Sequence, residues 1–340
     1  MKIAIGMMAC NEEGKIRSTI SSLAKQSVFE NPAHTISIHV VPNGCGDATS
    51  IHASEALHAL KKKHPSVRVE VRELTEGGKA NAWNHFVHVF SPADAEALLL
   101  LDADIHFGAH ECLDLLVKTL VESPTALVAV DRPLKDIATK KNPSLCERLS
   151  VRASELQVAG SPKIAGSLYL ARAEALRRFW MPLGLLVEDG FVKAMLLTDS
   201  FRHPEKKEGL VRAHGATHYF KAVTGLRDWF GHERRLLNGT ALNILLFEYI
   251  QKRVREGSDP KLVLRANNER DPLWVVGLAK GHRGTLPGGL EFVSEPLRKW
   301  NRMPMKEKIS FFPVALLRSG LNVAVFLTCQ SDFKLGRLDW

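Results

Sequence analysis

The segment Leu98-Leu-Leu-Leu-Asp102-Ala-Asp104 says more about the fold than any other part of this 340-residue sequence. Its leucines predict a short buried strand, and two acidic residues follow that strand directly. In a mostly parallel sheet, residues beyond the carboxyl ends of the strands gather where ligands bind. Two carboxylates there can hold Mg²⁺ or Mn²⁺, which prefer oxygen ligands and share phosphate oxygens. The segment therefore predicts a strand edge that binds a metal and a diphosphate, although a solvated acidic turn gives the same short pattern.

Strand-like and helix-like patterns alternate on both sides of this segment. Helical spacing of apolar residues occurs at 16–23, 53–60 and 80–90, and short apolar or alternating runs predict strands at 3–8, 36–41, 67–71, 97–101 and 128–132. This alternation predicts an α/β fold with a mostly parallel sheet. Small polar residues follow several of these strands, as a nucleotide crevice requires, at 8–13, 42–47, 73–79 and 102–104.

The second half of the chain is less regular. We expect a helix over 145–158, a strand over 164–172, a helix over 185–197 and a mainly helical region from residue 225 onward. A second acidic pair, Glu188-Asp189, begins the helical stretch at 185–197. Adjacent acids repel each other, so one of them is suited to accept a proton near neutral pH. The alternative is that both complement the positive end of a helix.

Composition limits the classes of partner and the cellular compartment. Lys and Arg outnumber Asp and Glu by 46 to 37, a net charge of +9 that favours anionic partners. Aromatic residues make up only 7% and do not alternate with basic ones, which argues against nucleic acid. The five cysteines form no C-x-x-C pair, so we expect a cytoplasmic protein without structural zinc.

Six motifs in this order and spacing resemble family 2 glycosyltransferases: Met7-Met-Ala-Cys-Asn11-Glu12-Glu13-Gly, Val41-Pro-Asn43-Gly-Cys-Gly-Asp47-Ala-Thr49, Gly77-Gly-Lys79-Ala-Asn81-Ala, Asp102-Ala-Asp104, Ile164-Ala-Gly166-Ser-Leu-Tyr-Leu-Ala-Arg172 and Glu188-Asp189-Gly. The resemblance implies a GT-A fold and inverting, metal-dependent transfer from a nucleotide diphosphate sugar to a hydroxyl. It also implies a catalytic domain over 1–225, with a nucleotide-binding half at 1–131 and an acceptor-side half at 132–225. A mainly helical region at 226–340 follows.

Carried over residue by residue, the resemblance assigns roles to the motif positions. It implies a general base at Asp189 with Glu188 as the substitute, metal ligands at Asp104 and Asp102, and an acceptor-side loop at Gly166 and Ser167. The donor and nucleotide residues that it implies are Ala9, Asn11, Glu12, Asn43, Lys79, Asp102, Ala103 and Arg235.

Two positions depart from the pattern of the family. Pro42-Asn43 stands where many members carry an aspartate that contacts uracil, although a UDP-sugar remains the first donor to test. His232-Glu-Arg-Arg235-Leu236 replaces the Gln-x-x-Arg-Trp signature of processive synthases, so processive synthesis is not expected. His218 and His232 are candidates for an additional metal ligand, because a histidine from this region serves so in some GT-A enzymes. In a chain with 14 histidines, an ordinary core or surface position is the commoner explanation for either one.

The resemblance implies a saccharide or lipid-linked acceptor, as in bacterial-type polysaccharide or glycolipid assembly. The alternatives are a non-catalytic protein that binds nucleotide sugars and a nucleotidyltransferase. An oxidoreductase is disfavoured because the glycine pattern at Gly44-Cys-Gly46 lacks its third glycine and follows the second strand instead of the first.

The segment 311–329 is apolar but contains Pro313, Arg318 and Asn322, so a transmembrane helix is disfavoured. Its apolar residues occur at several helical phases, which predicts packing on the catalytic domain. The alternative is peripheral contact at the cytoplasmic face of an anionic membrane, with Lys299, Trp300 and Arg302 among the headgroups.

Overall fold

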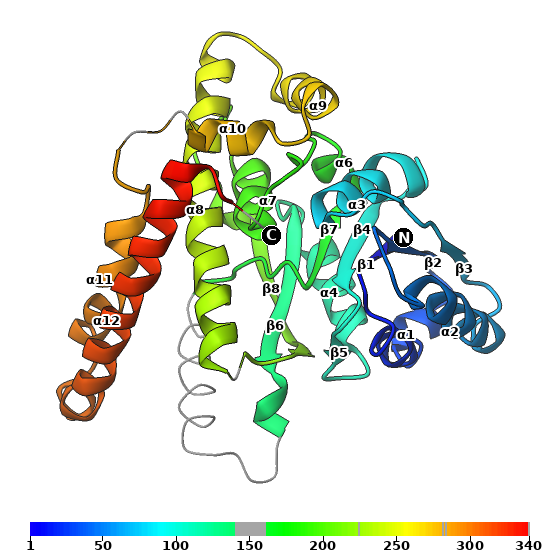
Figure 1. The fold of residues 1–340 in the computed structure, drawn as a ribbon. Coiled ribbons are helices and arrows are strands. Elements are labelled where there is room, and N and C mark those ends of the chain that lie inside the picture. Colours follow the sequence, from blue (N-terminus) through cyan, green and yellow to red (C-terminus); the bar gives the residue numbers. More distant parts are fainter. Residues whose placement is uncertain (140–160, 224, 281, 283, 339–340) are drawn as a thin grey trace. The chain divides into compact units, whose positions relative to one another are not determined.

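The computed structural model describes residues 1–139, 161–223, 225–280, 282 and 284–338 (Figure 1). The chain divides into two compact units, one of Met1–Met181 with Phe191–Ala222 and the other of Pro182–Gly190 with Val223–Trp340. The segment 182–190, which was expected in the acceptor-side half, thus groups with the C-terminal helices. The predicted helix at 145–158 lies outside the described residues.

The first unit contains one sheet with the strand order β3-β2-β1-β4-β7-β6-β8-β5. Strands β3, β2, β1 and β4 are parallel to one another, while β7 runs antiparallel to both β4 and β6. Strand β8 is parallel to β6 and antiparallel to β5. This mixed, mostly parallel sheet confirms the predicted α/β class. The strands are β1 Lys2–Ala9, β2 Thr35–Pro42, β3 Arg68–Val71, β4 Ala97–Asp102, β5 His106–Phe107, β6 Val128–Lys135, β7 Leu168–Arg172 and β8 Leu210–Phe220.

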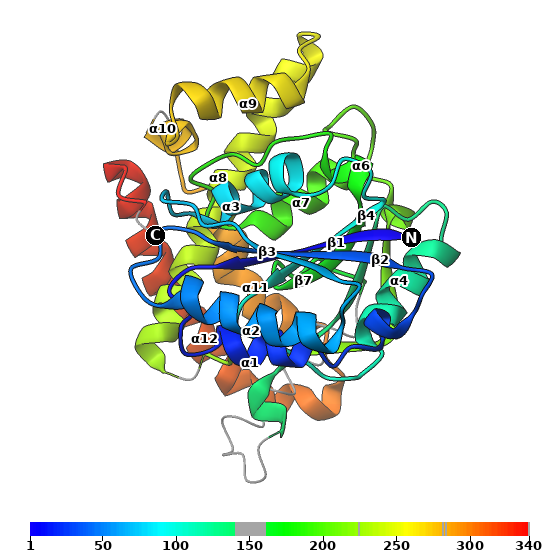
Figure 2. The same cartoon turned by 90° about the vertical axis from the view of Figure 1, so that its right-hand side faces the viewer.

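Helices cover both faces of the sheet, as Figure 2 shows for α1 and α2 on one side of β1 to β3 and α3 on the other. Alternate residues of β1 enter a core with the apolar sides of α1, α2 and α4, because side chains along a strand point to opposite faces. The helices of this unit and of the segment that joins it to the next are α1 Ile16–Leu23, α2 Thr49–Lys63, α3 Lys79–His85, α4 Cys112–Glu122, α6 Ala173–Leu176 and α7 Glu188–Leu197.

On the other face, Gly6 of β1 lets an aromatic ring pack directly on the backbone. A Cβ atom at this position would lie 2.5 Å from a ring carbon of Phe86, so a larger residue would push the segment after α3 away. Trp83 of α3 stacks on Phe179 and donates its indole N–H to the Tyr169 hydroxyl at 2.7 Å. These contacts fix α3, which begins at Lys79, against β1 and β7.

The second unit is mainly helical, as predicted. Its helices are α8 Leu226–Arg255, α9 Pro260–Arg270, α10 Trp274–Lys280, α11 Gly289–Asn301 and α12 Met305–Leu335. Asp259 caps α9 by accepting a hydrogen bond from the Lys261 N–H, and Pro260 occupies the first helical turn, where its missing donor costs nothing.

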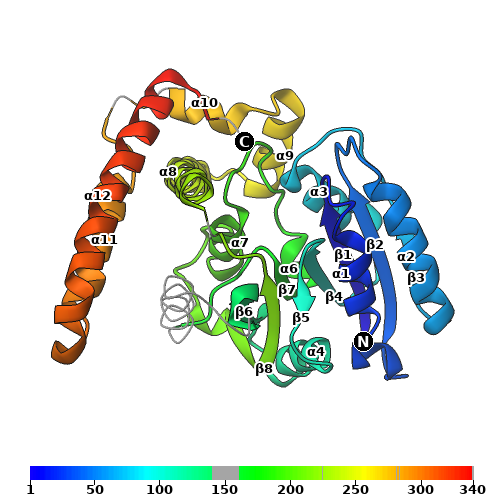
Figure 3. The ribbon, with the colours of Figure 1, turned by 60° about the horizontal axis from the view of Figure 1, so that its bottom comes forward.

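Helices α11 and α12 lie side by side (Figures 1 and 3). The segment Phe311–Leu335 has the length and hydropathy of a membrane-crossing helix, and only 22% of its apolar 18-residue window is buried. Most of this segment is thus exposed in the structure, and its packing on the catalytic domain stays a prediction. Apolar residues at several helical phases do not show how many neighbours a helix has. The neighbours of α12 cover only one side of the helix.

Candidate active site

The loops after β1 and β2 are joined by side chains that hydrogen-bond to backbone groups. Asn11 adopts a left-handed backbone with φ of 53°, which asparagine tolerates better than most residues, and its side-chain oxygen accepts the Gly46 N–H at 2.9 Å. The buried Asn43 donates its amide to the Ala9 carbonyl at 2.9 Å and accepts the Gly78 N–H at 2.9 Å. Asn43 therefore holds three loops together, a role that the sequence did not predict.

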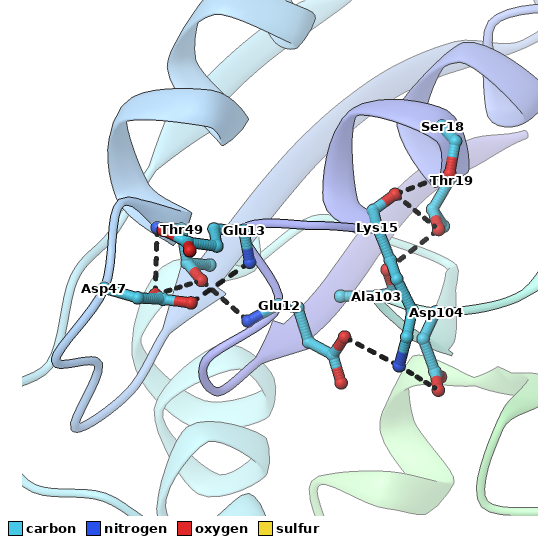
Figure 4. A network of polar contacts seen from close by, with 9 residues as sticks. All are labelled: Glu12, Glu13, Lys15, Ser18, Thr19, Asp47, Thr49, Ala103 and Asp104. Carbon is cyan, nitrogen blue, oxygen red and sulfur yellow. Dashed lines mark hydrogen bonds and ion pairs between the residues drawn. The ribbon is translucent and has the colours of Figure 1, made fainter.

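A polar network fixes the first residues after β1 (Figure 4). The Glu12 N–H donates to the Thr49 hydroxyl at 2.7 Å, and the Glu13 N–H donates to Asp47 at 3.2 Å. Hydrogen bonds from Thr49 lower the pKa of Asp47 below its usual value. With its backbone held in this way, Glu12 directs its carboxylate toward the end of β4.

Lys15 places a positive charge between two of the predicted site residues. Its ammonium lies 3.0 Å from Glu12 Oε2 and 3.3 Å from Asp104 Oδ2 (Figure 4). Burial opposes the charged form, but the hydrogen bonds and charges of Glu12 and Asp104 outweigh burial and raise the pKa of Lys15. The carboxylates of Glu12 and Asp104 thus already face one cation. Sequence reasoning missed Lys15, and its position directly before the predicted helix at 16–23 was the signal available.

A second lysine pairs with the other carboxylate of the Asp-x-Asp motif. Lys79 Nζ lies 2.7 Å from Asp102 Oδ1 and donates to the Gly166 carbonyl at 3.1 Å. The next residue, Ser167, accepts the Asp102 N–H at 3.0 Å through its own carbonyl. The structure thereby brings together the predicted donor residues Lys79 and Asp102 and the predicted acceptor-side loop at Gly166 and Ser167. Ala103 between the acids is buried, and its carbonyl accepts the Thr19 hydroxyl at 2.8 Å.

His218 belongs to a buried chain of polar side chains beneath this loop. Its Nδ1 lies 2.6 Å from Asp131 Oδ2, and its Nε2 lies 2.8 Å from the Ser167 hydroxyl. Both ring nitrogens are engaged and the side chain is fully buried, so this arrangement offers no nitrogen of His218 to a metal, contrary to its candidacy as a ligand. Instead, His218 supports the Ser167 loop. Asp131 was not predicted, and it lies where the register of β6 against β8 shifts, an irregularity that re-aims side chains.

The remaining predicted residues lie in the second unit. Glu188 and Asp189 occupy the first turn of α7, and Asp189 Oδ1 accepts the Gly190 N–H at 2.8 Å. The preceding residue, Val187, packs against Gly239 of α8, where a Cβ atom would lie 2.4 Å from a Val187 methyl group. The Val187 carbonyl also accepts the side-chain amide of Asn243 at 2.9 Å.

The same side of α8 carries both residues of the altered processive-synthase signature. His232 and Arg235 precede Gly239 by seven and four positions, so the three share one face of the helix. Arg235 is exposed and His232 is half-buried. Within the second unit, the acidic pair and these two residues therefore lie along one side of α8.

The described part of the first unit offers oxygen ligands for a metal but not a full set of protein ligands. Among the residues that the structure describes, no group of three or more His, Cys, Asp and Glu side chains is arranged to hold a metal ion. The carboxylates of Asp102 and Asp104 are partly exposed, and each already contacts an ammonium group. Their hard oxygens fit Mg²⁺ or Mn²⁺, which commonly bind through one or two carboxylates together with substrate phosphates and water.

Comparisons with known proteins agree with this architecture. Residues 4–166 match Glycosyl transferase family 2, and a comparison with curated proteins gave no match. A mannosyltransferase from Pyrobaculum calidifontis, solved with GDP-Man and Mn²⁺, has a TM-score of 0.52 at 17% identity, covering 98% of this chain and 86% of that one. Glucosyl-3-phosphoglycerate synthase from Mycobacterium tuberculosis, solved with Mn²⁺, UDP and glucosyl-3-phosphoglycerate, has a TM-score of 0.46 at 18% identity, covering 71% and 77%. The first of these likenesses confirms the predicted GT-A-type fold.

Proposed function

We propose that this chain, whose residues 4–166 match glycosyl transferase family 2, is an inverting, metal-dependent enzyme that moves a sugar from a nucleotide diphosphate sugar to a hydroxyl group. The chain is a nucleotide-sugar glycosyltransferase, and inversion, metal dependence and the class of acceptor are the proposed parts. The observation that carries the proposal is the meeting of Glu12, Lys15, Lys79, Asp102 and Asp104 at the carboxyl ends of β1 and β4.

The charges at this edge suit a diphosphate. Lys79 carries a positive charge beside Asp102, and Lys15 carries one beside Asp104. Asp102 and Asp104 would hold the metal, which would neutralise the charge that develops on the departing diphosphate. Once a metal binds these carboxylates, both lysines can turn their charge toward phosphate oxygens. Glu12, on the loop held by Asp47 and Thr49, is positioned to accept hydrogen bonds from the ribose.

Asp189 is the proposed general base. One displacement inverts the anomeric carbon, so a single base that takes the proton from the acceptor hydroxyl is sufficient. Asp189 stands in the first turn of α7, where the helix N-terminus stabilises its ionised, proton-accepting form. Glu188 beside it is the substitute, and Arg235 on the neighbouring face of α8 is the proposed contact to the diphosphate.

The acceptor is proposed to be a saccharide or a lipid-linked saccharide. Gly166 and Ser167 are proposed to line its site, because their loop lies directly beside Lys79 and Asp102 in the first unit. The structures compared above contain GDP-Man and UDP respectively, so GDP-mannose and UDP-glucose are the first donors to test. Assembly of a polysaccharide or glycolipid is the proposed context.

The test is the release of nucleoside diphosphate from labelled UDP-glucose and GDP-mannose by the full chain, with Mn²⁺ or with EDTA. Release that requires Mn²⁺ and fails in Asp189→Asn supports the proposal. Metal-dependent binding without release, for every donor tried, would identify a non-catalytic nucleotide-sugar-binding protein. Formation of a nucleotide sugar and pyrophosphate from a nucleoside triphosphate and a sugar phosphate would identify a nucleotidyltransferase.

A further inference from the structure

Helix α12 exposes a continuous apolar surface along its outer side. Five of its six members are spaced three, four or seven residues apart and so lie on one side of the helix, and Leu317 adjoins them. Their exposed fractions reach 83% at Ile309 and 67% at Leu317. We call this surface the α12 outer face, and it consists of Ile309, Phe312, Leu316, Leu317, Val323 and Leu327.

Polar contacts tie the inner side of α12 to the rest of the second unit. Arg318 donates to Glu233 of α8 at 3.0 Å, and the Asn322 amide donates to the Phe292 carbonyl of α11 at 2.9 Å. Near the C-terminal end, Asp332 pairs with Arg234 of α8 at 2.6 Å. Apolar residues are buried on this side as well, at Ala315, Val325, Cys329 and Phe333. Apolar side chains therefore occupy both sides of α12, and those of the α12 outer face remain exposed to solvent.

The dimensions and neighbours of α12 favour a flat orientation on a bilayer over a span. From Ile309 to Leu327 the helix rises about 27 Å, close to the hydrocarbon thickness of a membrane. However, α11 runs antiparallel beside it, since Asn322 contacts Phe292 and Trp300 contacts Lys308. A spanning α12 would carry the charged residues of α11 into the hydrocarbon, at a high energetic cost: Glu291, Glu295, Arg298 and Lys299.

The turn that joins α11 to α12 has the features of a headgroup anchor. Residues 298–308 contain five basic residues and one acidic residue. The Trp300 indole donates to the Lys308 carbonyl at 2.8 Å, and the Lys308 ammonium lies 5.5 Å from the centre of the Trp300 ring. Tryptophan and basic side chains are the residues that settle at the interface between hydrocarbon and anionic headgroups.

We propose that the α12 outer face lies in the interface of an anionic lipid bilayer, with the basic 298–308 turn among the headgroups. This inference is independent of the proposed chemistry, because it rests on the second unit alone. The apolar face supplies burial in the acyl region, and the basic turn supplies attraction to anionic lipid. The occupant is a membrane surface, so the full chain should bind vesicles that contain no protein and no nucleotide.

The test is sedimentation of the full chain with vesicles of phosphatidylcholine alone or mixed equally with phosphatidylglycerol. We expect binding to the anionic vesicles that weakens as salt is added. The variant Leu316→Glu/Leu327→Glu should bind about tenfold more weakly or worse. Leu262→Glu, an equally exposed leucine on α9, is the matched control and should bind like the wild type. Arg302→Gln/Lys308→Gln should lower binding to anionic vesicles by about tenfold.

Three outcomes would overturn the proposal. One is a soluble protein that binds neither kind of vesicle. Another is a dimer in light scattering that Leu316→Glu/Leu327→Glu converts to a monomer without any vesicle binding, which would make a second copy the occupant. The third is resistance to alkaline carbonate extraction, which would indicate a span. Circular dichroism of each variant establishes that it is folded, so loss of vesicle binding reports the surface itself.

Discussion

The sheet has a parallel half, β3-β2-β1-β4, and a mixed half, β7-β6-β8-β5. The two halves assemble their polar residues in different ways. In the parallel half, Asn11, Glu12, Lys79, Asp102 and Asp104 follow a strand or begin the next helix, and most of them are partly exposed. In the mixed half, Asp131, Ser167 and His218 come from distant parts of the chain and form a chain of contacts that ends in full burial. The parallel half therefore leaves its charged groups partly exposed, where the proposed ligand would bind, whereas the mixed half supports the loop beside them.

The largest expected effect lies outside both halves, at the proposed base. Asp189→Asn should lower turnover by about 10² to 10⁴, the usual contribution of general base catalysis. Donor affinity should stay near that of the wild type, because the base acts mainly in the transition state. Steady-state kinetics and calorimetric titration of the donor measure the two quantities. Glu188→Gln is the matched control, and a larger loss in that variant would transfer the role of base to Glu188.

The supporting role of the mixed half predicts a loss of stability. His218→Ala leaves the buried Asp131 carboxylate without its nitrogen partner, so the free energy of unfolding should fall by about 2 kcal/mol. Urea denaturation measures this, with the exposed His214→Ala on the same strand as the control. The double variant His218→Ala/Asp131→Ala should lose less than the sum of the single variants. Additive losses would contradict a shared buried contact.

The proposed ligand-binding role of the parallel half predicts that variants there change the affinity for nucleotide or metal but lose little stability. Lys79→Met removes the charge beside Asp102 and should weaken binding of a nucleoside diphosphate by about tenfold, on the order of one charge-assisted hydrogen bond. Lys15→Met should instead strengthen Mn²⁺ binding, because it removes the ammonium that contacts Asp104. Titration calorimetry measures the affinity for the nucleotide and the affinity for Mn²⁺ separately. The same changes of both affinities in the two variants would argue against distinct roles for the lysines.

The smallest effect concerns pH and a buried histidine of the parallel half. Burial lowers the pKa of His39 below its usual value, so the unfolded chain binds a proton at a higher pH than the folded one. Acidification from about pH 7 to pH 5 should therefore reduce the free energy of unfolding. In His39→Gln this loss should be smaller than in the wild type. The exposed His58→Gln on α2 should retain the full dependence.

The same difference between the halves explains how far the sequence could be interpreted. Four leucines followed by Asp102 and Asp104 indicate a strand end without further information, because strand and acids are adjacent in the chain. The pairing of Asp131 with His218 spans 87 positions and depends on how β6 lies against β8. Nothing local marks it, so the sequence offered His218 only as a candidate metal ligand and did not reveal its pairing with Asp131.

Helix α12 shows a second limit of sequence reasoning. Its apolar residues could be recognised, and a helix was expected, but hydropathy does not reveal which phases meet protein. The structure buries Asn322 together with Val325 and Phe333, whereas Leu316, Leu317 and Leu327 are exposed. This exposed apolar side was not predicted, although the basic and tryptophan residues at 298–308 already suggested the alternative of membrane contact.

The direct test of a metal-bridged donor site is calorimetric titration of UDP and GDP into the wild type and Asp104→Asn, each with Mn²⁺ and with EDTA. We expect at least one of the two nucleotides to bind the wild type in Mn²⁺ and to lose that binding in EDTA. Asp104→Asn should remain folded and bind weakly in both conditions, because it lacks the carboxylate that would hold the metal. Equal binding by the two proteins, or binding by the wild type that EDTA leaves unchanged, would contradict a metal held at Asp104.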